Sequence, residues 1–470
     1  MHKLKYITFA ALVLSCCGMV ACGDSYPESH IEPYATDLLS IKIVNAGPGQ
    51  NETLTGKIDE ENKMVNFPRL DTASNFSAIK IEAEVSAGAT VQKTEYDFSM
   101  DPEDTYKTLL LRVSNHHRYK DYFIKVRKHV DIYGADFKYV KVNEFTGDRR
   151  YADYAGSLTR GADFDGTHVL VVTRSATRPH LLKVSDLQAD KRIPIPLDLT
   201  DVSGGTFPYN TGALANGHIY LASLSGGKAS PLKIYYWDTP TSKPEVIANI
   251  NIASIPGAGA RHGDNMSLNI DKYGNGFIFF GDNLSTEILR LTVTGHKTIN
   301  NPTVLSSNPN MTTSMSMYRI EDTSQYLLAG LRFPIALTDE TGSVKYQLKQ
   351  SHIAEESIAA RIFTFNKARY LMTCTVGFGG STKATPTLNL YDITKGRTVQ
   401  EALEKFDAGN NHNPVYSFIL GGAFVTAPGV NTNYYIERDA NGNDQKLYLF
   451  ASRINSGFVI CELPAAVDED

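Results

Sequence analysis

The sequence predicts an all-β protein in two parts, a small β-sandwich followed by a β-propeller. The composition favours β structure with many tight turns, since the 470 residues include 25 Tyr and 36 Gly. Short alternating apolar stretches separated by Gly, Asn, Asp and Pro occupy residues 36–131. In residues 132–470 one apolar strand pattern recurs six times, which is the sequence form of a propeller.

The N-terminus has the three-part pattern of a secretory signal. Basic residues between His2 and Lys5 precede an apolar, uncharged run over Tyr6–Leu14. Small residues around Cys22 end the apolar character before it reaches the ~20 residues that a membrane-spanning helix needs. We therefore expect residues 1–21 to be a signal peptide.

The end of this run, Met19-Val20-Ala21-Cys22-Gly23, resembles the lipobox of bacterial lipoproteins. In that family the cysteine sulfur carries a diacylglycerol, and the signal peptide is cut just before it. The resemblance implies that Cys22 is lipidated and anchors the protein in a membrane, with Cys16 as a poorer second candidate. Residues 22–35, rich in Gly, Pro, Ser and Glu, then form a tether.

Two acidic residues soon after Cys22, Asp24 and Glu28, resemble the surface-export signals of Bacteroidota-type lipoproteins. The resemblance implies an outer-membrane lipoprotein that faces the cell surface.

Residues 36–131 contain the strand-like stretches LLSIKIVN, AIKIEAEV, TLLLRV and YFIKVRKH, which predict a small β-sandwich. Their order resembles the N-terminal immunoglobulin-like modules of surface lipoproteins from gut bacteria. The resemblance rests on Asp97-Phe98-Ser99 and on the closing strand Tyr122–Val126. It implies an immunoglobulin-like sandwich.

The repeated strand is near-continuously apolar, because the central strands of a blade are buried against neighbouring blades on both faces. Its six copies begin at residues 168, 218, 276, 325, 369 and 447. The last unit stops after GFVICEL, and residues 137–142 form a lone strand before the first unit. Pairing the two would close the ring and remove exposed edges. Six blades are therefore predicted, and a seventh within residues 408–446 is the alternative.

The charge and cysteine content limit the partners and cofactors. A formal net charge of -5 and a pI near 6.2 lack the basic stripe that nucleic-acid binding requires. After Cys22 the remaining cysteines, Cys374 and Cys461, lie in apolar stretches that predict buried free thiols, although a disulfide between them stays open. No metal site and no cofactor are predicted.

Candidate ligand-binding residues lie in the connections that enter the first strand of each repeat, which converge around the central channel of a propeller. They are Tyr209, Asn210, Arg261, His262, Asp264, Asn265, His352, Glu355, Asn411 and His412. Amide, imidazole and hydroxyl groups of this kind hydrogen-bond a polar, uncharged ligand such as a sugar. The alternative is ordinary turn chemistry, since Asn, Asp and Gly dominate turns.

No nucleophile elbow, phosphate-binding loop, zinc-protease or dinucleotide motif occurs in the sequence. The layout resembles an uncharacterised lipoprotein family of Bacteroidota-type bacteria, with an immunoglobulin-like module and a propeller of unknown function. We expect a surface-binding protein for a polysaccharide or other polar ligand. A glycan-active hydrolase or lyase and a protein–protein scaffold in an outer-membrane complex are the alternatives, and whether the protein is an enzyme stays open.

Replacing Cys22 tests the anchor. Cys22→Ser removes the thiol that accepts the lipid, so labelled fatty acid should no longer enter the protein, and the uncut precursor should accumulate. Cys16→Ser is the matched control and should leave labelling unchanged. Labelling that survives Cys22→Ser but disappears in Cys16→Ser would move the anchor to Cys16.

Overall fold

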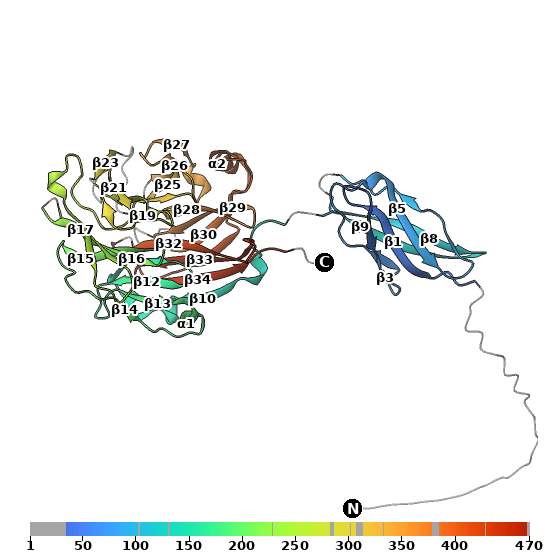
Figure 1. Ribbon diagram of the computed structural model, residues 1–470, viewed down its shortest axis with the longest axis horizontal. Helices are drawn as coiled ribbons and strands as arrows, with labels where there is room; N and C mark the ends of the chain where they lie inside the picture. Colours follow the sequence, from blue (N-terminus) through green and yellow to red (C-terminus); the bar gives the residue numbers. More distant parts are fainter. Residues whose placement is uncertain are drawn as a thin grey trace, which may run out of the picture. The chain divides into compact units, whose positions relative to one another are not determined.

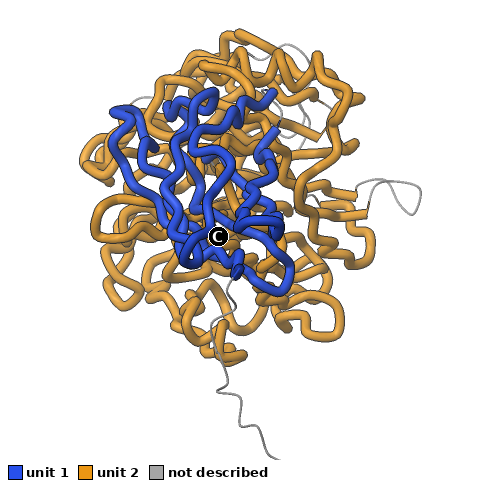
Figure 2. Tube along the Cα trace, turned by 90° about the vertical axis from the view of Figure 1, so that its right-hand side faces the viewer, with its two compact units in different colours: residues 1–131, 470 blue, residues 132–469 orange. Residues whose placement is uncertain are grey.

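The structure is a computed structural model. It describes residues 34–101, 104–129, 132–227, 229–282, 286–300, 302–306, 314–331, 333–377, 385–427 and 429–467. The chain divides into two compact units, residues 1–131 with residue 470, and residues 132–469 (Figure 2). The predicted signal peptide, Cys22 and most of the tether lie outside the described residues.

The first unit is a two-sheet β-sandwich (Figure 1). One sheet has the order β2 (Glu52–Thr55), β1 (Leu38–Ala46), β5 (Ile79–Val85), β7 (Glu95–Tyr96). The other has the order β3 (Lys57–Asp59), β4 (Met64–Asn66), β9 (Arg118–Arg127), β8 (Tyr106–Asn115), β6 (Thr90–Val91). Alternate residues of both sheets, such as Ile41 and Ile124, are fully buried in one shared core.

The second unit consists, in its described residues, of six antiparallel sheets. In the first five sheets the strands follow chain order; the first sheet is β11 (Thr159–Phe164), β12 (His168–Thr173), β13 (His180–Lys183) and β14 (Ile195–Pro196), and the second is β15 (Phe207–Ala215), β16 (His218–Leu224), β17 (Pro231–Trp237) and β18 (Glu245–Asn251). The third sheet is β19 (Ser267–Ile270), β20 (Gly276–Gly281), β21 (Glu287–Thr294) and β22 (Thr298–Ile299), and β23 (Thr303–Ser306) also pairs with β21. The fourth is β24 (Ser316–Arg319), β25 (Gln325–Gly330), β26 (Phe333–Asp339) and β27 (Val344–Gln347), and the fifth is β28 (Ser357–Phe365), β29 (Ala368–Thr375), β30 (Thr387–Asp392) and β31 (Tyr416–Ile419). The sixth is β32 (Val430–Arg438), β33 (Asp444–Arg453), β34 (Gly457–Pro464) and β10 (Lys141–Phe145). Two short α-helices accompany them, α1 (Val184–Gln188) and α2 (Val399–Ala408).

The repeated apolar pattern corresponds to the second strand of every sheet, namely β12, β16, β20, β25, β29 and β33. In β12, Val169 and Val171 face the core shared with the sixth sheet, while Leu170 and Val172 face the core shared with the second. Each consecutive pair of sheets shares such a core, and so do the sixth and the first. Burial on both faces therefore explains the continuous apolar runs, and the fold is β-propeller-like.

The lone strand before the first sheet begins a few residues later than the predicted residues 137–142. Phe137–Tyr139 form a 3-10 turn, because the Asp136 carboxylate accepts a hydrogen bond from the Lys138 backbone N–H at 2.9 Å. The strand is β10, and it pairs with β34 from Lys141↔Glu462 to Phe145↔Phe458. The expected partnership with the last unit is thus present with different strand bounds.

Residues 408–446 contribute β31 to the fifth sheet and β32 to the sixth. Among the described residues this segment adds no seventh sheet. Cys374 in β29 and Cys461 in β34 are buried free thiols, as the sequence predicted. In the part of the chain that the structure describes, neither helix has the length and apolar character needed to cross a bilayer.

Truncating Phe145 tests how much the β10 contact stabilises the larger unit. Phe145 is buried and stacks on Phe458 with ring centroids 4.8 Å apart. Phe145→Ala should lower the free energy of unfolding by about 3–5 kcal/mol, measured by chemical denaturation. Val142→Ala on the same strand is the control, because Val142 is 40% exposed, and it should cost less than about 1 kcal/mol. Equal effects of the two variants would contradict the role of Phe145.

Candidate ligand-binding site at the channel mouth

A channel runs between the first strands of the six sheets. The strands β11, β15, β19, β24, β28 and β32 contact one another in this order, and β32 contacts β11. Three hollows follow one another along these strands, and neighbouring hollows share lining residues. The volume of the hollow is about 10 Å³ where the strands begin, about 50 Å³ midway and about 870 Å³ where the strands end. Since one water needs roughly 10–15 Å³ by this measure, the narrow part admits waters but no sugar ring.

The middle of the channel is a hydrogen-bonded polar network. Asp163 accepts hydrogen bonds from the Leu214 backbone N–H and from Asn433 Nδ2, both at 2.8 Å. The Arg361 guanidinium lies 3.5 Å from the centre of the Tyr318 ring and donates to a backbone carbonyl of β32. Burial raises the pKa of Asp163 and that of Tyr318. These groups join neighbouring first strands across the channel.

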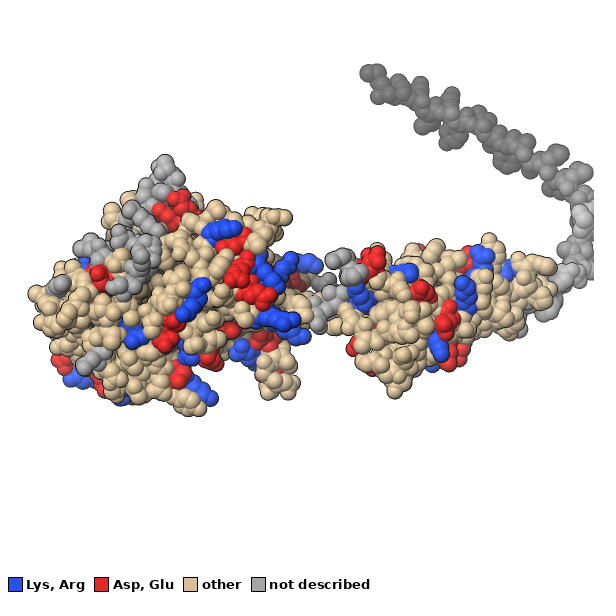
Figure 3. Space-filling model, turned by 90° about the horizontal axis from the view of Figure 1, so that it is seen from above, with Lys and Arg blue, Asp and Glu red and all other residues tan. Residues whose placement is uncertain are grey.

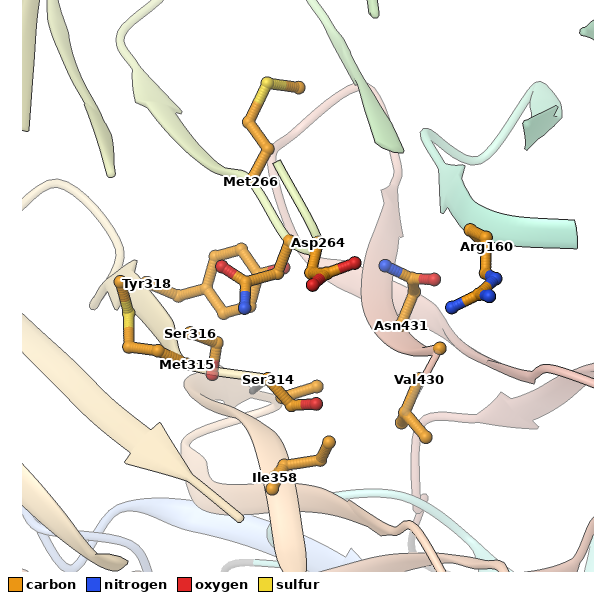
Figure 4. Close-up of a pocket in the computed structure, with 13 residues that line it drawn as sticks. Arg160, Asp264, Met266, Ser314, Met315, Ser316, Tyr318, Ile358, Val430 and Asn431 are labelled. Atoms are coloured by element: carbon orange, nitrogen blue, oxygen red, sulfur yellow. The ribbon is translucent and has the colours of Figure 1, made fainter. Parts of the chain in front are cut away.

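We call the narrow hollow where the first strands begin the entry mouth. Its lining residues are Arg160, Asp264, Asn265, Met266, Ser314, Met315, Ser316, Tyr318, Ile358, Ala359, Gly429, Val430 and Asn431. Figure 4 shows the side chains of Asp264, Asn431 and Arg160 directed toward the same space. Beside them, Nη2 of Arg261 lies 3.7 Å from Oδ2 of Asp264.

Arg174, the residue after β12, is fixed next to this mouth. Its guanidinium carbon lies 3.4 Å from the centre of the Phe207 ring, and Nη2 donates to Oδ1 of Asn210. The Asn210 Nδ2 in turn donates to the Gly263 carbonyl at 2.6 Å. Arg174 is therefore connected through one amide to the loop that carries Arg261 and Asp264.

Several arginine side chains lie close together at the entry mouth, and their positive charges affect one another. Burial lowers the pKa of Arg174 to about 10, with the charges of Arg160 and Arg261 acting in the same direction and Asp264 acting against them. Burial also lowers the pKa of Arg160. The charge of Asp264 raises this pKa, and the charge of Arg261 lowers it. Three guanidinium groups thus share the carboxylate of Asp264.

The loop between Gly259 and Asn265 is held by backbone contacts. Oδ2 of Asp282 accepts the Arg261 backbone N–H at 2.9 Å, and the His262 carbonyl accepts the Ser225 N–H at 2.9 Å. Gly263 has φ +96°, and a Cβ there would lie 2.1 Å from the Ser223 carbonyl oxygen, so only glycine fits. The loop therefore presents Arg261 and Asp264 in a fixed position.

Six of the predicted residues come together at or beside the entry mouth: Tyr209, Asn210, Arg261, His262, Asp264 and Asn265. Asn210 and His262 are buried beneath the surface, and Nε2 of His262 faces the Ala258 carbonyl. These two residues position their neighbours. The sequence interpretation missed Arg160 and Arg174, because it considered only the connections that enter the first strands, whereas Arg160 lies within β11 and Arg174 follows β12.

The other four predicted residues do not line the entry mouth. Nδ1 of His352 lies 2.9 Å from Oδ1 of Asp407 in α2, and the His352 and His412 rings stack at 3.7 Å. Asn411 makes an ordinary turn by accepting the Asn413 N–H at 3.0 Å, and it lines a separate groove of about 560 Å³ beside α2.

The expected convergence was wrong for His352, Asn411 and His412, because α2 holds the two histidines and residues 411–413 lead into the outer strand β31. Glu355 is exposed just before β28 and also lies outside the mouth lining. Among the described residues, no group of three or more His, Cys, Asp and Glu side chains is arranged to hold a metal ion.

Comparison with known proteins places the chain in a family. The model of the family described as Domain of unknown function (DUF4623) matches residues 24–466. The chain belongs to the DUF4623 family. A crystal structure of a DUF4623 family protein from Bacteroides eggerthii DSM 20697 is 55% identical, with a TM-score of 0.84, covering 92% of this chain and 99% of that chain.

Two further solved structures match weakly. YCF48 from Cyanidioschyzon merolae is 8% identical with a TM-score of 0.35, covering 69% of this chain and 98% of that chain. BamB from Moraxella catarrhalis is 10% identical with a TM-score of 0.32, covering 67% and 85%. No curated protein matches the chain.

The buried carboxyl of Asp163 should make stability pH-dependent. The pKa of Asp163 is raised in the folded state, so the unfolded chain loses this proton at a lower pH than the folded protein does. The free energy of unfolding therefore falls as the pH rises from the pKa in the unfolded chain to the pKa in the folded protein. Asp163→Asn should remove this part of the pH dependence, measured by denaturant unfolding from about pH 4 to 7. An unchanged pH slope in the variant would contradict a raised pKa at Asp163.

Proposed function

We propose that the protein is a lipid-anchored, cell-surface binding protein that holds a polysaccharide or other polar ligand at the entry mouth. The mature chain begins at Cys22, and its lipid keeps the protein in the outer membrane. The lipobox-like Met19–Gly23 and the acidic residues after Cys22 support this placement. An immunoglobulin-like sandwich then serves as a spacer.

In this proposal the larger unit is a closed six-bladed propeller. The six shared cores between consecutive sheets support that ring, as does the pairing of β10 with β34. A closed ring brings residues from different sheets to the same channel mouth. It therefore accounts for a site whose lining extends from Arg160 to Asn431.

The observation that carries the binding role is the cluster of hydrogen-bonding and charged groups at an opening too narrow for a sugar ring. Arg160 and Asp264 line the hollow of about 10 Å³ at which the channel narrows, and Arg174 and Arg261 lie beside it. A ligand is thus held over the mouth from outside.

The same dimensions disfavour a hydrolase or lyase within the channel. A glycan-cleaving enzyme needs acid and base groups within hydrogen-bond reach of the substrate. The channel acid, Asp163, is buried beside a hollow of about 50 Å³ and accepts two hydrogen bonds from its own protein. Substrate reaches this carboxyl only if the first strands separate.

A polysaccharide panel tests the proposal. The soluble form from residue 36 should bind at least one polysaccharide in affinity gel electrophoresis and calorimetry, without releasing shorter products on chromatography. Release of products would replace the binding role with the glycan-active enzyme. Failure to bind every glycan would favour the scaffold.

Two matched variants locate the site on the ring. Arg261→Gln alters the entry mouth, whereas Tyr435→Ala alters the larger hollow at the opposite end of the channel, which Tyr435 lines. Binding should weaken in Arg261→Gln and persist in Tyr435→Ala. The reverse result would move the ligand to the opposite end.

A further inference from the structure

Within the described residues, three arginines gather around the single carboxylate of Asp264 at the entry mouth. Arg160 and Arg174 belong to the first sheet, and Arg261 precedes the third, so the fold brings them together from distant parts of the chain. Of their acidic neighbours, Asp264 acts on both Arg160 and Arg174, and it lies 3.7 Å from Arg261. On the face of the protein that Figure 3 shows, both signs of charge are interspersed.

Half-buried cations without counter-charges cost free energy, because burial removes water and the like charges repel. The lowered pKa values of Arg160 and Arg174 reflect both causes. An anion placed among these groups would relieve the repulsion and offset the cost of burial by its attraction to the cations. Arginine suits such an anion, because the planar fork of its donors matches the geometry of a carboxylate or a similar oxyanion.

Two guanidinium nitrogens of these arginines lack partners in the described part of the chain. Nε of Arg174 and Nε of Arg261 are buried and have no hydrogen-bond partner among the described residues. Arg160 uses its own Nε on the Ser157 carbonyl at 2.9 Å, which fixes its direction. Arg174 is fixed by the Phe207 ring and by Asn210. The guanidinium groups are thus positioned before a ligand arrives, which reduces the entropy lost on binding.

We propose that the entry mouth binds an oxyanion carried by a glycan, the carboxylate of a uronic acid or a sulfate ester, and not a neutral sugar. This inference rests on the proposed function and specifies its ligand. The anion sits among Arg160, Arg174 and Arg261, and the remainder of the sugar chain stays outside the channel. Asp264 limits the excess positive charge and orients Arg261.

The test uses the soluble form from residue 36 with three polymers. Polygalacturonate and chondroitin sulfate carry the two oxyanions, and methyl-esterified polygalacturonate is the matched neutral polymer. We expect at least one anionic polymer to bind at least about tenfold more tightly than the neutral one, the scale of one lost charge-assisted hydrogen bond. Binding should weaken at high salt, because the site is partly exposed.

Variants assign the effect to the arginines. Arg174→Gln and Arg261→Gln should each weaken anionic binding by about tenfold. Arg174→Lys keeps the charge but loses the planar fork, so it should fall between wild type and Arg174→Gln. Arg319→Gln is the control, because Arg319 lines the hollow at the opposite end of the channel, and it should bind like wild type. A circular dichroism melt of each variant shows that it is folded.

The outcomes separate this inference from the proposed function. If the esterified polymer binds as tightly as the anionic polymers, and neither salt nor Arg174→Gln weakens the binding, the oxyanion site is overturned. The proposed function as a glycan-binding protein would then still stand. If no glycan binds, the proposed function fails, and galacturonate and inorganic sulfate become the probes. Stabilisation of wild type but not Arg174→Gln by either ion would retain the oxyanion site, and no effect of either ion would overturn it.

Discussion

The pairing of β10 with β34 is the contact on which the larger unit depends. It joins a strand from the start of the unit to the last strand of the chain, from Lys141↔Glu462 to Phe145↔Phe458. Without it β34 would present an unpaired edge, and the core shared by the first and sixth sheets would lose Phe145. The direct contact of β11 with β32 and the remainder of that core would then hold the first and sixth sheets together without the help of β10.

The candidate site depends on the side-by-side packing of the six sheets. Its charged groups come from the beginning of β11, from the end of β12 and from the loop before β19. Local structure orients each of them: Phe207 and Asn210 hold Arg174, and Asp282 holds the backbone of Arg261. Sheets that pack side by side can in this way bring positive charge together at one opening of the channel, although the formal net charge of the chain is -5.

Much of the fold could be predicted from the sequence, because two-sided burial leaves a local trace. Strands such as HVLVVTR are apolar at every position that contacts a neighbouring sheet. The start of β10 could not be placed, because the Asp136 side chain turns the chain before the strand begins.

For the candidate site, the connections that enter the first strands led to the prediction of Arg261 and Asp264. Arg174 could not be predicted in this way, because its position depends on Phe207 and Asn210 in another sheet. His352 and His412 were misplaced, because α2 and Asp407 were not predicted. Lipidation of Cys22 stays a prediction.

A crystal structure of the soluble form with a uronic-acid oligosaccharide tests the account most directly. It should show one carboxylate within about 2.7–3.0 Å of guanidinium nitrogens of Arg174 and Arg261, with the remaining sugars outside the channel. An oligosaccharide ordered instead against Arg319 and Tyr435 at the opposite end, with the entry mouth unchanged, would contradict it.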